Sequence, residues 1–294
     1  MSGLYYLYLK VAAVLLRALT KLEWKIAPRP DSVAFIPSRE PGRNIRVHFY
    51  QSSLSNTREP SNLLINFHGS GFVLPLHGSD DEYCRKISRN TKYSVMDVQY
   101  RLAPENPFPA ALHDAQDAVQ WVLSHPDRFN LQTLSVCGFS AGGNLALVAS
   151  SYLFPPHTFR SVITFYPSVE AFVDPATLVS PDAGGRPLPK YVVRLFKQCY
   201  LQSGEDAYDP RMSPALAEVR NFPRNVLIIT AGYDTLAYEA ERLADKLRQN
   251  PDRRVVSERM EKCDHAWDKL VKPGTREWDL KCRAYEMAVE LLQD

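Results

Sequence analysis

The segment Gly138–Gly142 (GFSAG) places one serine, Ser140, between two glycines. An apolar segment that begins at Leu134 precedes this serine, and a segment rich in alanine, leucine and valine follows it. A serine on a sharp turn from a strand to a helix presents its hydroxyl above the sheet, and larger residues at the glycine positions would collide there. We therefore interpret Ser140 as a nucleophile rather than as part of an ordinary glycine-rich start of a helix.

A second glycine-rich turn, HGSG at residues 68–71, follows the apolar segment Leu63–Phe67. Acyl transfer needs hydrogen-bond donors aimed at a developing oxyanion, and backbone N–H groups of such a loop can supply them. The expected donors are the N–H groups of Ser70, Gly71 and Ala141. His68 and Gly69 are expected to hold the loop in shape. The alternative is a turn that only requires glycine at positions of positive φ.

Five motifs occur in a fixed order: HGSG, YRLAPENPFPAALHDAQDAVQWV, GFSAGG, DPRMSP and AGYDTLAYEAERLADKL. Together they resemble the hormone-sensitive-lipase-like branch of the α/β-hydrolases, over roughly Leu63 to His265. This resemblance implies a carboxylesterase with a cap built from the N-terminus and from an insertion after the sixth strand. Two positions depart from the family: Ser70 stands where a glycine is usual, and Phe139 where an aspartate is common. Neither change removes a backbone donor.

The resemblance also implies the partners of Ser140, which follow it in the order Asp, His in this fold. Asp234 in AGYDTL matches the acid of the family, and His265 in CDHAWD matches its base. Asp264 and Asp268 flank the histidine and are the competing acids. The implied mechanism has Ser140 attack an ester carbonyl, His265 transfer the proton and Asp234 stabilise the imidazolium, before water releases the acid.

These residues predict a serine hydrolase that cleaves small esters of short to medium acyl chains and uses no metal or other cofactor. Amidase, formamidase or thioesterase chemistry is the alternative, because those reactions share the tetrahedral intermediate. A ligand-binding receptor is a second alternative, as in the gibberellin receptors, which resemble this family but lack the histidine that His265 supplies. Phe72, Phe139 and Tyr191 are expected to bind the substrate, and Trp24 and Phe196 are further candidates for the acyl pocket.

The elements that must position these residues alternate along the chain. Strands are expected at 46–50, 63–67, 93–98, 134–139, 161–166, 226–231 and 254–260, and helices at 80–90, 110–124, 141–153, 236–249 and 277–292. This alternation predicts an α/β-hydrolase-type α/β fold, with a mostly parallel central sheet and helices on both faces. Ligands of such sheets bind at the carboxyl ends of the strands. The segment 100–105 (YRLAPE) is expected to brace the HGSG loop, with Arg101 paired to Glu105.

The length of 294 residues and the hydrophobic content of 45% are compatible with one domain, 1–294. A segment of many prolines, at about 168–220, interrupts the alternation and contains a helical pattern around 191–200. It is too long for an ordinary loop. We therefore expect a helical cap formed by this insertion and by about residues 1–40.

The most apolar segment is Leu4–Leu16 (LYYLYLKVAAVLL), which Lys10 interrupts and which Arg17 and Lys21 follow. A spanning helix needs about 20 apolar residues, so we expect that this segment does not span a membrane. We expect an amphipathic helix that packs on its own protein. A helix at a membrane surface and a signal peptide are the alternatives.

Composition limits the partners. The net charge of +2 without a basic cluster argues against nucleic acid. The five cysteines and seven histidines have no metal-ligand spacing. We therefore expect reduced thiols in a cytoplasmic protein whose partner is a small ester substrate. A weak membrane-surface contact and a homodimer are left open.

Overall fold

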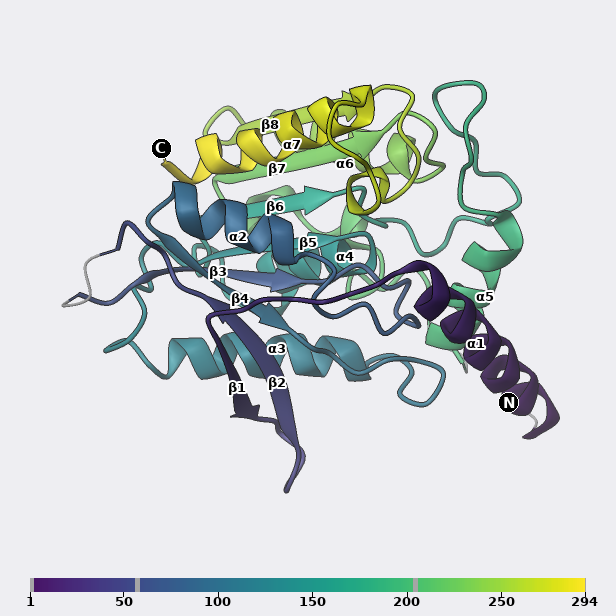
Figure 1. The fold of residues 1–294 in the computed structure, drawn as a ribbon, viewed down its shortest axis with the longest axis horizontal. Helices are drawn as coiled ribbons and strands as arrows, with labels where there is room; N and C mark the ends of the chain where they lie inside the picture. The colour runs from purple at the N-terminus through teal and green to yellow at the C-terminus, as the bar shows by residue number, and fades with distance from the viewer. Residues whose placement is uncertain (1–2, 56–58, 203–205, 294) are drawn as a thin grey trace.

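A twisted eight-stranded sheet runs through the centre of the molecule (Figure 1). The computed structural model describes residues 3–55, 59–202 and 206–293. The strand order is β1-β2-β4-β3-β5-β6-β7-β8; β2 is antiparallel to its neighbours β1 and β4, and the strands from β4 to β8 are parallel. The strands are β1 Ser32–Pro37, β2 Asn44–Tyr50, β3 Asn62–Phe67, β4 Tyr93–Val98, β5 Ser135–Phe139, β6 Ser161–Phe165, β7 Asn225–Ala231 and β8 Arg254–Met260.

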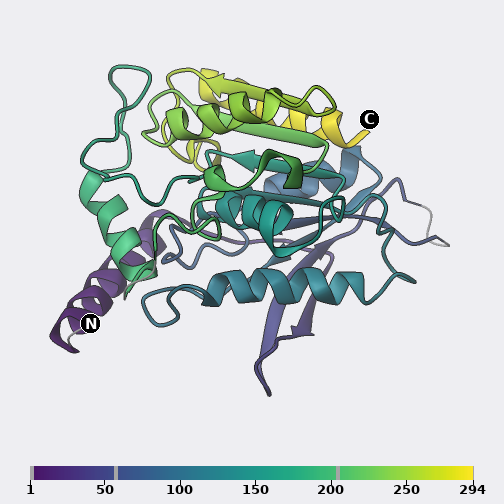
Figure 2. The same ribbon diagram turned by 180° about the vertical axis from the view of Figure 1, so that it is seen from behind.

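Helices cover both faces of this sheet (Figures 1 and 2). Two lie on one face, α2 Asp81–Asn90 and α7 Arg276–Gln293, and three on the other, α3 Ala110–Leu123, α4 Ala141–Val148 and α6 Ala237–Arg248. A π-helical turn at Ala149–Leu153 continues α4, and short 3₁₀ turns lie at Pro214–Leu216, Val219–Asn221 and Trp267–Lys269. Strands β3 to β7 are buried from both sides, which explains their continuous apolar sequences.

The predicted α/β fold with its mostly parallel sheet is confirmed. Each of the seven predicted strands is present, with bounds within two residues of the expected ones. Strand β1 was not predicted, because it is an edge strand that ends in Pro37 and leaves Phe35 67% exposed. Part of the expected cap range of about 1–40, Ser32–Pro37, pairs with β2 as part of the sheet. The remaining division into cap and core stays a prediction.

Two further helices lie together beyond the carboxyl ends of the parallel strands, α1 Gly3–Glu23 and α5 Lys190–Tyr200 (Figures 1 and 2). Helix α1 is long and apolar enough to cross a membrane by length and composition, contrary to the expectation from Lys10. It packs on its own protein through a narrow face only, because Leu9 and Ala13 are its buried residues. The wider, outward face of α1 is solvent-exposed.

Candidate active site

Ser140 occupies the turn between β5 and α4, with φ 51° and ψ −117°. Such a conformation is strained for any residue other than glycine and is held only when the surroundings enforce it. A Cβ atom on Gly138 would lie 2.2 Å from the Gly142 oxygen, and one on Gly142 would lie 1.9 Å from the Phe67 oxygen. The two motif glycines are therefore needed for close backbone packing, and this packing sets the turn that presents Ser140.

His265 lies between Ser140 and Asp234 in a continuous hydrogen-bonded chain. Its Nε2 is 2.9 Å from Ser140 Oγ, and its Nδ1 is 2.7 Å from Asp234 Oδ2. Asp234 follows β7, His265 lies in the loop after β8, and Ser140 follows β5, so the ends of three parallel strands bring the side chains together. A serine bonded to an imidazole that a buried carboxylate orients is the arrangement of an activated nucleophile.

The carboxylate of Asp234 is fully buried and has a second partner, because its Oδ1 accepts the Leu236 N–H at 3.1 Å. This bond fixes the carboxylate so that Oδ2 faces the imidazole. The competing aspartates bond elsewhere. Asp264 accepts the N–H of Arg186, while Asp268 accepts the hydroxyls of Tyr166 and Tyr285 and pairs with Lys269. Neither of these two carboxylates holds the His265 ring.

The HGSG loop lies against the nucleophile turn, since a Cβ atom on Gly69 would be 3.6 Å from that of Ser140. The backbone N–H groups of Ser70, Gly71 and Ala141 lie near this point, and within the described residues they have no hydrogen-bond acceptor. Unpaired donors beside a nucleophile can stabilise an oxyanion. The structure thus brings the three expected donors to one place.

A chain of hydrogen bonds fixes the loop. The Tyr100 hydroxyl donates to the His68 carbonyl oxygen at 2.6 Å. Because that donation uses its proton, the Ser70 hydroxyl, 2.6 Å away, must donate to the Tyr100 oxygen. Ser70 Oγ in turn accepts the Phe72 N–H at 2.8 Å. The serine that replaces the usual glycine therefore adds two bonds to the loop through its side chain.

The neighbours of this loop differ from one expectation. Arg101 pairs with Asp114 and Glu40, whereas Glu105 pairs with Arg17 at 2.8 Å. The predicted Arg101–Glu105 pair is wrong because the fully buried Asp114 carboxylate attracts the arginine.

A cavity of about 380 Å³ opens onto Ser140 and His265. Its walls come from the HGSG loop, α1, α5 and the segment that precedes α5, and they are mostly apolar. Large side chains of the lining include Trp24, Phe72, Phe196, Tyr200, Leu16 and Val193. Such a cavity can bind a small substrate with an apolar group next to the serine.

Phe72 is the member of the predicted substrate-binding set that lines this cavity. Phe139 does not, because its ring is fully buried on the α2/α7 face and stacks on Phe165 with 4.5 Å between centroids. Tyr191 does not either, because it is 74% exposed on the outer side of α5. The cavity-lining side of α5 carries Val192, Val193, Phe196 and Tyr200. These residues repeat at spacings of three and four, and this pattern in the sequence could have identified the side of α5 that lines the cavity.

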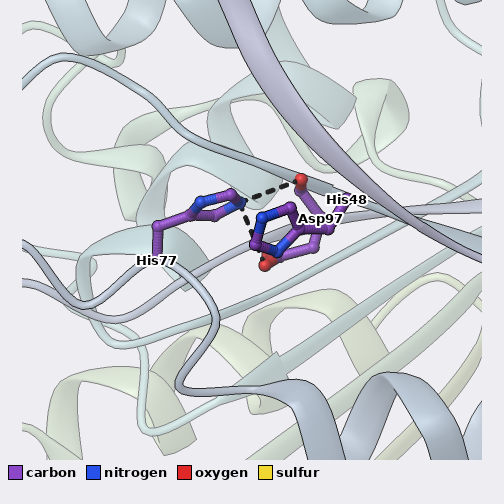
Figure 3. A group of neighbouring side chains, drawn as sticks. All are labelled: His48, His77 and Asp97. Atoms are coloured by element: carbon purple, nitrogen blue, oxygen red, sulfur yellow. Dashed lines mark hydrogen bonds and ion pairs between the residues drawn. The ribbon is translucent and has the colours of Figure 1, made fainter. Parts of the chain in front are cut away.

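Three further side chains could hold a metal by type and proximity, because the ligand atoms of His48, His77 and Asp97 lie within 4.8 Å of one another (Figure 3). The two rings lie close together and tilted, however, with 4.1 Å between centroids and 34° between planes. Imidazoles that share a tetrahedral zinc would have centroids about 5 Å apart and diverge. The geometry fits an ion pair instead, with His77 Nε2 3.2 Å from Asp97 Oδ2.

The pKa values agree with this ion pair. Burial opposes the charge of His77, but Asp97 outweighs burial and raises the pKa of the imidazole. Burial likewise opposes the charge of Asp97, and His77 outweighs it and lowers the pKa of the carboxyl to about 2. Burial also lowers the pKa values of His48 and His68 to about 4, so these two rings are neutral at pH 7.

Neutral buried histidines predict that acid destabilises the fold. Below pH 6.5 the unfolded chain binds protons at His48 and His68 that the folded chain does not bind until about pH 4, so the free energy of unfolding falls as the pH falls through this window. We expect a loss of roughly 1 to 2 kcal/mol per histidine between pH 6.5 and 5. Urea unfolding at both pH values measures this loss, and His48→Phe should reduce it; an unchanged loss in that variant would contradict the assignment.

The model of the alpha/beta hydrolase fold family matches residues 64–269. The chain is 34% identical over 196 residues to the carboxylic ester hydrolase LipN of Mycobacterium tuberculosis, covering 63% of this chain and 52% of LipN. It is 28% identical over 229 residues to the ethyl acetate hydrolase of Pseudomonas putida, covering 76% and 72%. The match thus spans about half of LipN and nearly three quarters of the second relative.

Solved structures agree with the sequence matches. An esterase of Pyrobaculum calidifontis superimposes with a TM-score of 0.74 and 27% identity, covering 100% of this chain and 93% of that one. The thermostable carboxylesterase EstE1, cloned from a metagenomic library, gives a TM-score of 0.74 and 27% identity, with coverages of 99% and 97%.

Proposed function

This chain belongs to the α/β-hydrolase fold family, and from that premise we propose that it is a carboxylesterase that acts through Ser140, His265 and Asp234. The observation that carries the proposal is the hydrogen-bonded chain through His265, which ends on a serine at the floor of an apolar cavity. The esterases among the relatives support the reaction class.

The proposed reaction has two halves. In the first, Ser140 Oγ attacks the ester carbonyl while His265 Nε2 takes its proton, and the unpaired N–H groups of the HGSG loop and Ala141 stabilise the oxyanion. The intermediate then expels the alcohol, to which His265 returns the proton. In the second half, His265 activates a water that attacks the acyl group on Ser140, and the acid leaves. Asp234 stabilises the imidazolium in both halves.

Two alternatives share this site. A non-catalytic receptor has no need of the histidine, and here His265 bonds to both Ser140 and Asp234. Amide or thioester cleavage would use the same intermediate, and the named activities of the relatives favour esters. We propose short to medium acyl chains, because a cavity of about 380 Å³ holds a limited apolar group.

The proposed acyl preference depends on α5 as part of the cap over the cavity. Phe196 packs on Gly71, where a Cβ atom would come within 2.3 Å of the ring, so this phenylalanine closes the cavity beside the expected oxyanion hole. Phe196→Ala should therefore enlarge the acyl site. We expect the ratio of kcat/KM for octanoate to that for butyrate to rise by at least about tenfold, the lower end of what one methylene is worth in an apolar pocket.

The measurement is a panel of p-nitrophenyl acetate, butyrate, octanoate and palmitate, with matched anilides and thioesters. The wild type should prefer butyrate over palmitate and esters over anilides. Tyr191→Ala is the matched control, because that ring lies on the same helix but is exposed. Equal shifts in both variants would contradict the cavity assignment, and a preference for thioesters or anilides would contradict the esterase proposal.

A further inference from the structure

Helix α1 carries a continuous apolar face that nothing in the described chain covers. Its members include Leu4, Leu7, Val11, Leu15, Leu19 and Leu22, each with half or more of its surface exposed. They repeat at spacings of three and four residues, which places them on one side of the helix. Soluble monomers seldom leave so large an apolar patch in water, so this face points to a binding partner.

The charges beside this face indicate what the partner is. Lys10 and Lys21 are exposed and eleven residues apart, which is three turns, so they lie along the same side of the apolar face. Lys25 follows the helix, and Glu23 is the single acidic residue within it. An apolar face bordered by lysines matches a bilayer surface with anionic headgroups, where leucines enter the acyl boundary and lysines meet phosphate or carboxylate groups.

The opposite face ties α1 to the catalytic body. Arg17 donates to the carbonyl oxygens of Val73 and Ala103 at 2.9 and 2.7 Å and pairs with Glu105 at 2.8 Å. These bonds hold the helix against the segments that carry and brace the HGSG loop. A helix that crossed a bilayer would have to break them and bury the arginine in lipid. The contacts therefore favour a helix that lies along the membrane surface.

The same inner face also reaches the cavity, which Leu16, Thr20 and Trp24 line. One helix thus has a cavity on one side and an exposed apolar face on the other. We propose that α1 rests in the headgroup region of an anionic bilayer and that the cavity takes lipophilic esters from that surface. The membrane binding stands alone, whereas the uptake of esters rests on the proposed esterase function.

Substitutions on the two faces separate these roles. The outward-face variant carries three substitutions, Val11→Gln, Leu15→Gln and Leu22→Gln, which make the exposed apolar face polar. None of these three residues lines the cavity. The partition coefficient of this variant onto phosphatidylcholine vesicles with phosphatidylserine should fall by at least about tenfold, since three apolar side chains leave the lipid. Its kcat/KM on soluble p-nitrophenyl butyrate should stay unchanged. Lys10→Gln/Lys21→Gln should weaken binding to these vesicles and not to vesicles of phosphatidylcholine alone.

Leu16→Gln is the matched variant of the inner face, which should change kcat/KM on the soluble ester and keep vesicle binding. Cosedimentation measures binding, and thermal unfolding checks that each variant is folded. Wild-type protein that stays in the supernatant, or an outward-face variant that binds as well as the wild type, would overturn the inference. Resistance of the membrane-bound wild-type protein to extraction by alkaline carbonate would indicate a spanning helix and would also overturn the inference. The same holds if the wild type is a dimer that does not bind vesicles and the outward-face variant is a monomer.

The failure of the esterase proposal gives a different result. Ser140→Ala should bind vesicles as the wild type does, because Ser140 lines the cavity and is not part of the outward face of α1. If the wild-type protein bound vesicles but had no esterase activity, this result would contradict the proposed function and the uptake of esters. It would still support the proposed membrane binding of α1. With active enzyme, hydrolysis of an ester embedded in the vesicles should fall in the outward-face variant, while hydrolysis of the soluble ester should not.

Discussion

Ser140→Ala is expected to lower kcat/KM for p-nitrophenyl butyrate by about 10⁵ to 10⁶, as the loss of a nucleophile does in other serine hydrolases. The alanine leaves His265 and Asp234 in place but removes the atom that bonds to the acyl carbon. No other hydroxyl bonds to His265 in the described part of the chain. Steady-state kinetics with highly purified protein measures the loss, and circular dichroism checks the fold.

Ser168→Ala is the control for this substitution, because Ser168 lines the same cavity without bonding to the histidine. Its activity should remain within about tenfold of the wild type, a loss that one positioning contact can cause. If Ser140→Ala kept even a hundredth of the wild-type kcat/KM, Ser140 would not be the nucleophile.

Asp234→Asn should lower kcat by about 10⁴ with little change in KM. The asparagine can still accept the Leu236 N–H through its oxygen, so its amide nitrogen would face His265 Nδ1. A donor at that point favours the tautomer with the proton on Nε2, which cannot take the proton of Ser140. The substrate contacts in the cavity stay intact, which is why KM should change little.

Asp264→Asn is the matched control for the acid. Asp264 is next to His265 in sequence, but its carboxylate accepts the Arg186 N–H. Stopped-flow or steady-state rates of the two variants separate the roles. Equal losses in Asp234→Asn and Asp264→Asn would show that the hydrogen bond to His265 does not determine the rate.

Sequence patterns predicted the sheet well because most of its strands are buried on both faces, where only short runs of apolar and β-branched residues fit. The resemblance to the hydrolase family indicated Asp234 and His265 as the partners of Ser140. The structure brings these three residues together because each follows a strand and parallel strands end at one edge of the sheet. Strand β1 was not predicted, because an exposed edge strand that is preceded by Pro30 and ends in Pro37 lacks that apolar pattern.

The surroundings of the site depended on contacts that sequence does not reveal. Arg17 and Glu105 are 88 residues apart, so their ion pair depends on how α1 docks. Phe139 is adjacent to the nucleophile in sequence, but the alternation of side chains along β5 sends its ring to the far face of the sheet. Tyr191 precedes the lining residues of α5 by one position, and one position rotates a helical side chain by about 100°.

The central claim is that an acyl group passes through Ser140, and covalent trapping tests it most directly. Wild-type protein should be incubated with the organophosphate paraoxon, and its mass and tryptic peptides should then be measured. We expect one diethylphosphoryl group per chain, located on Ser140, with loss of activity in proportion to labelling and no labelling of Ser140→Ala. A stoichiometric label on another residue, or full esterase activity in protein whose Ser140 is completely modified, would contradict the account.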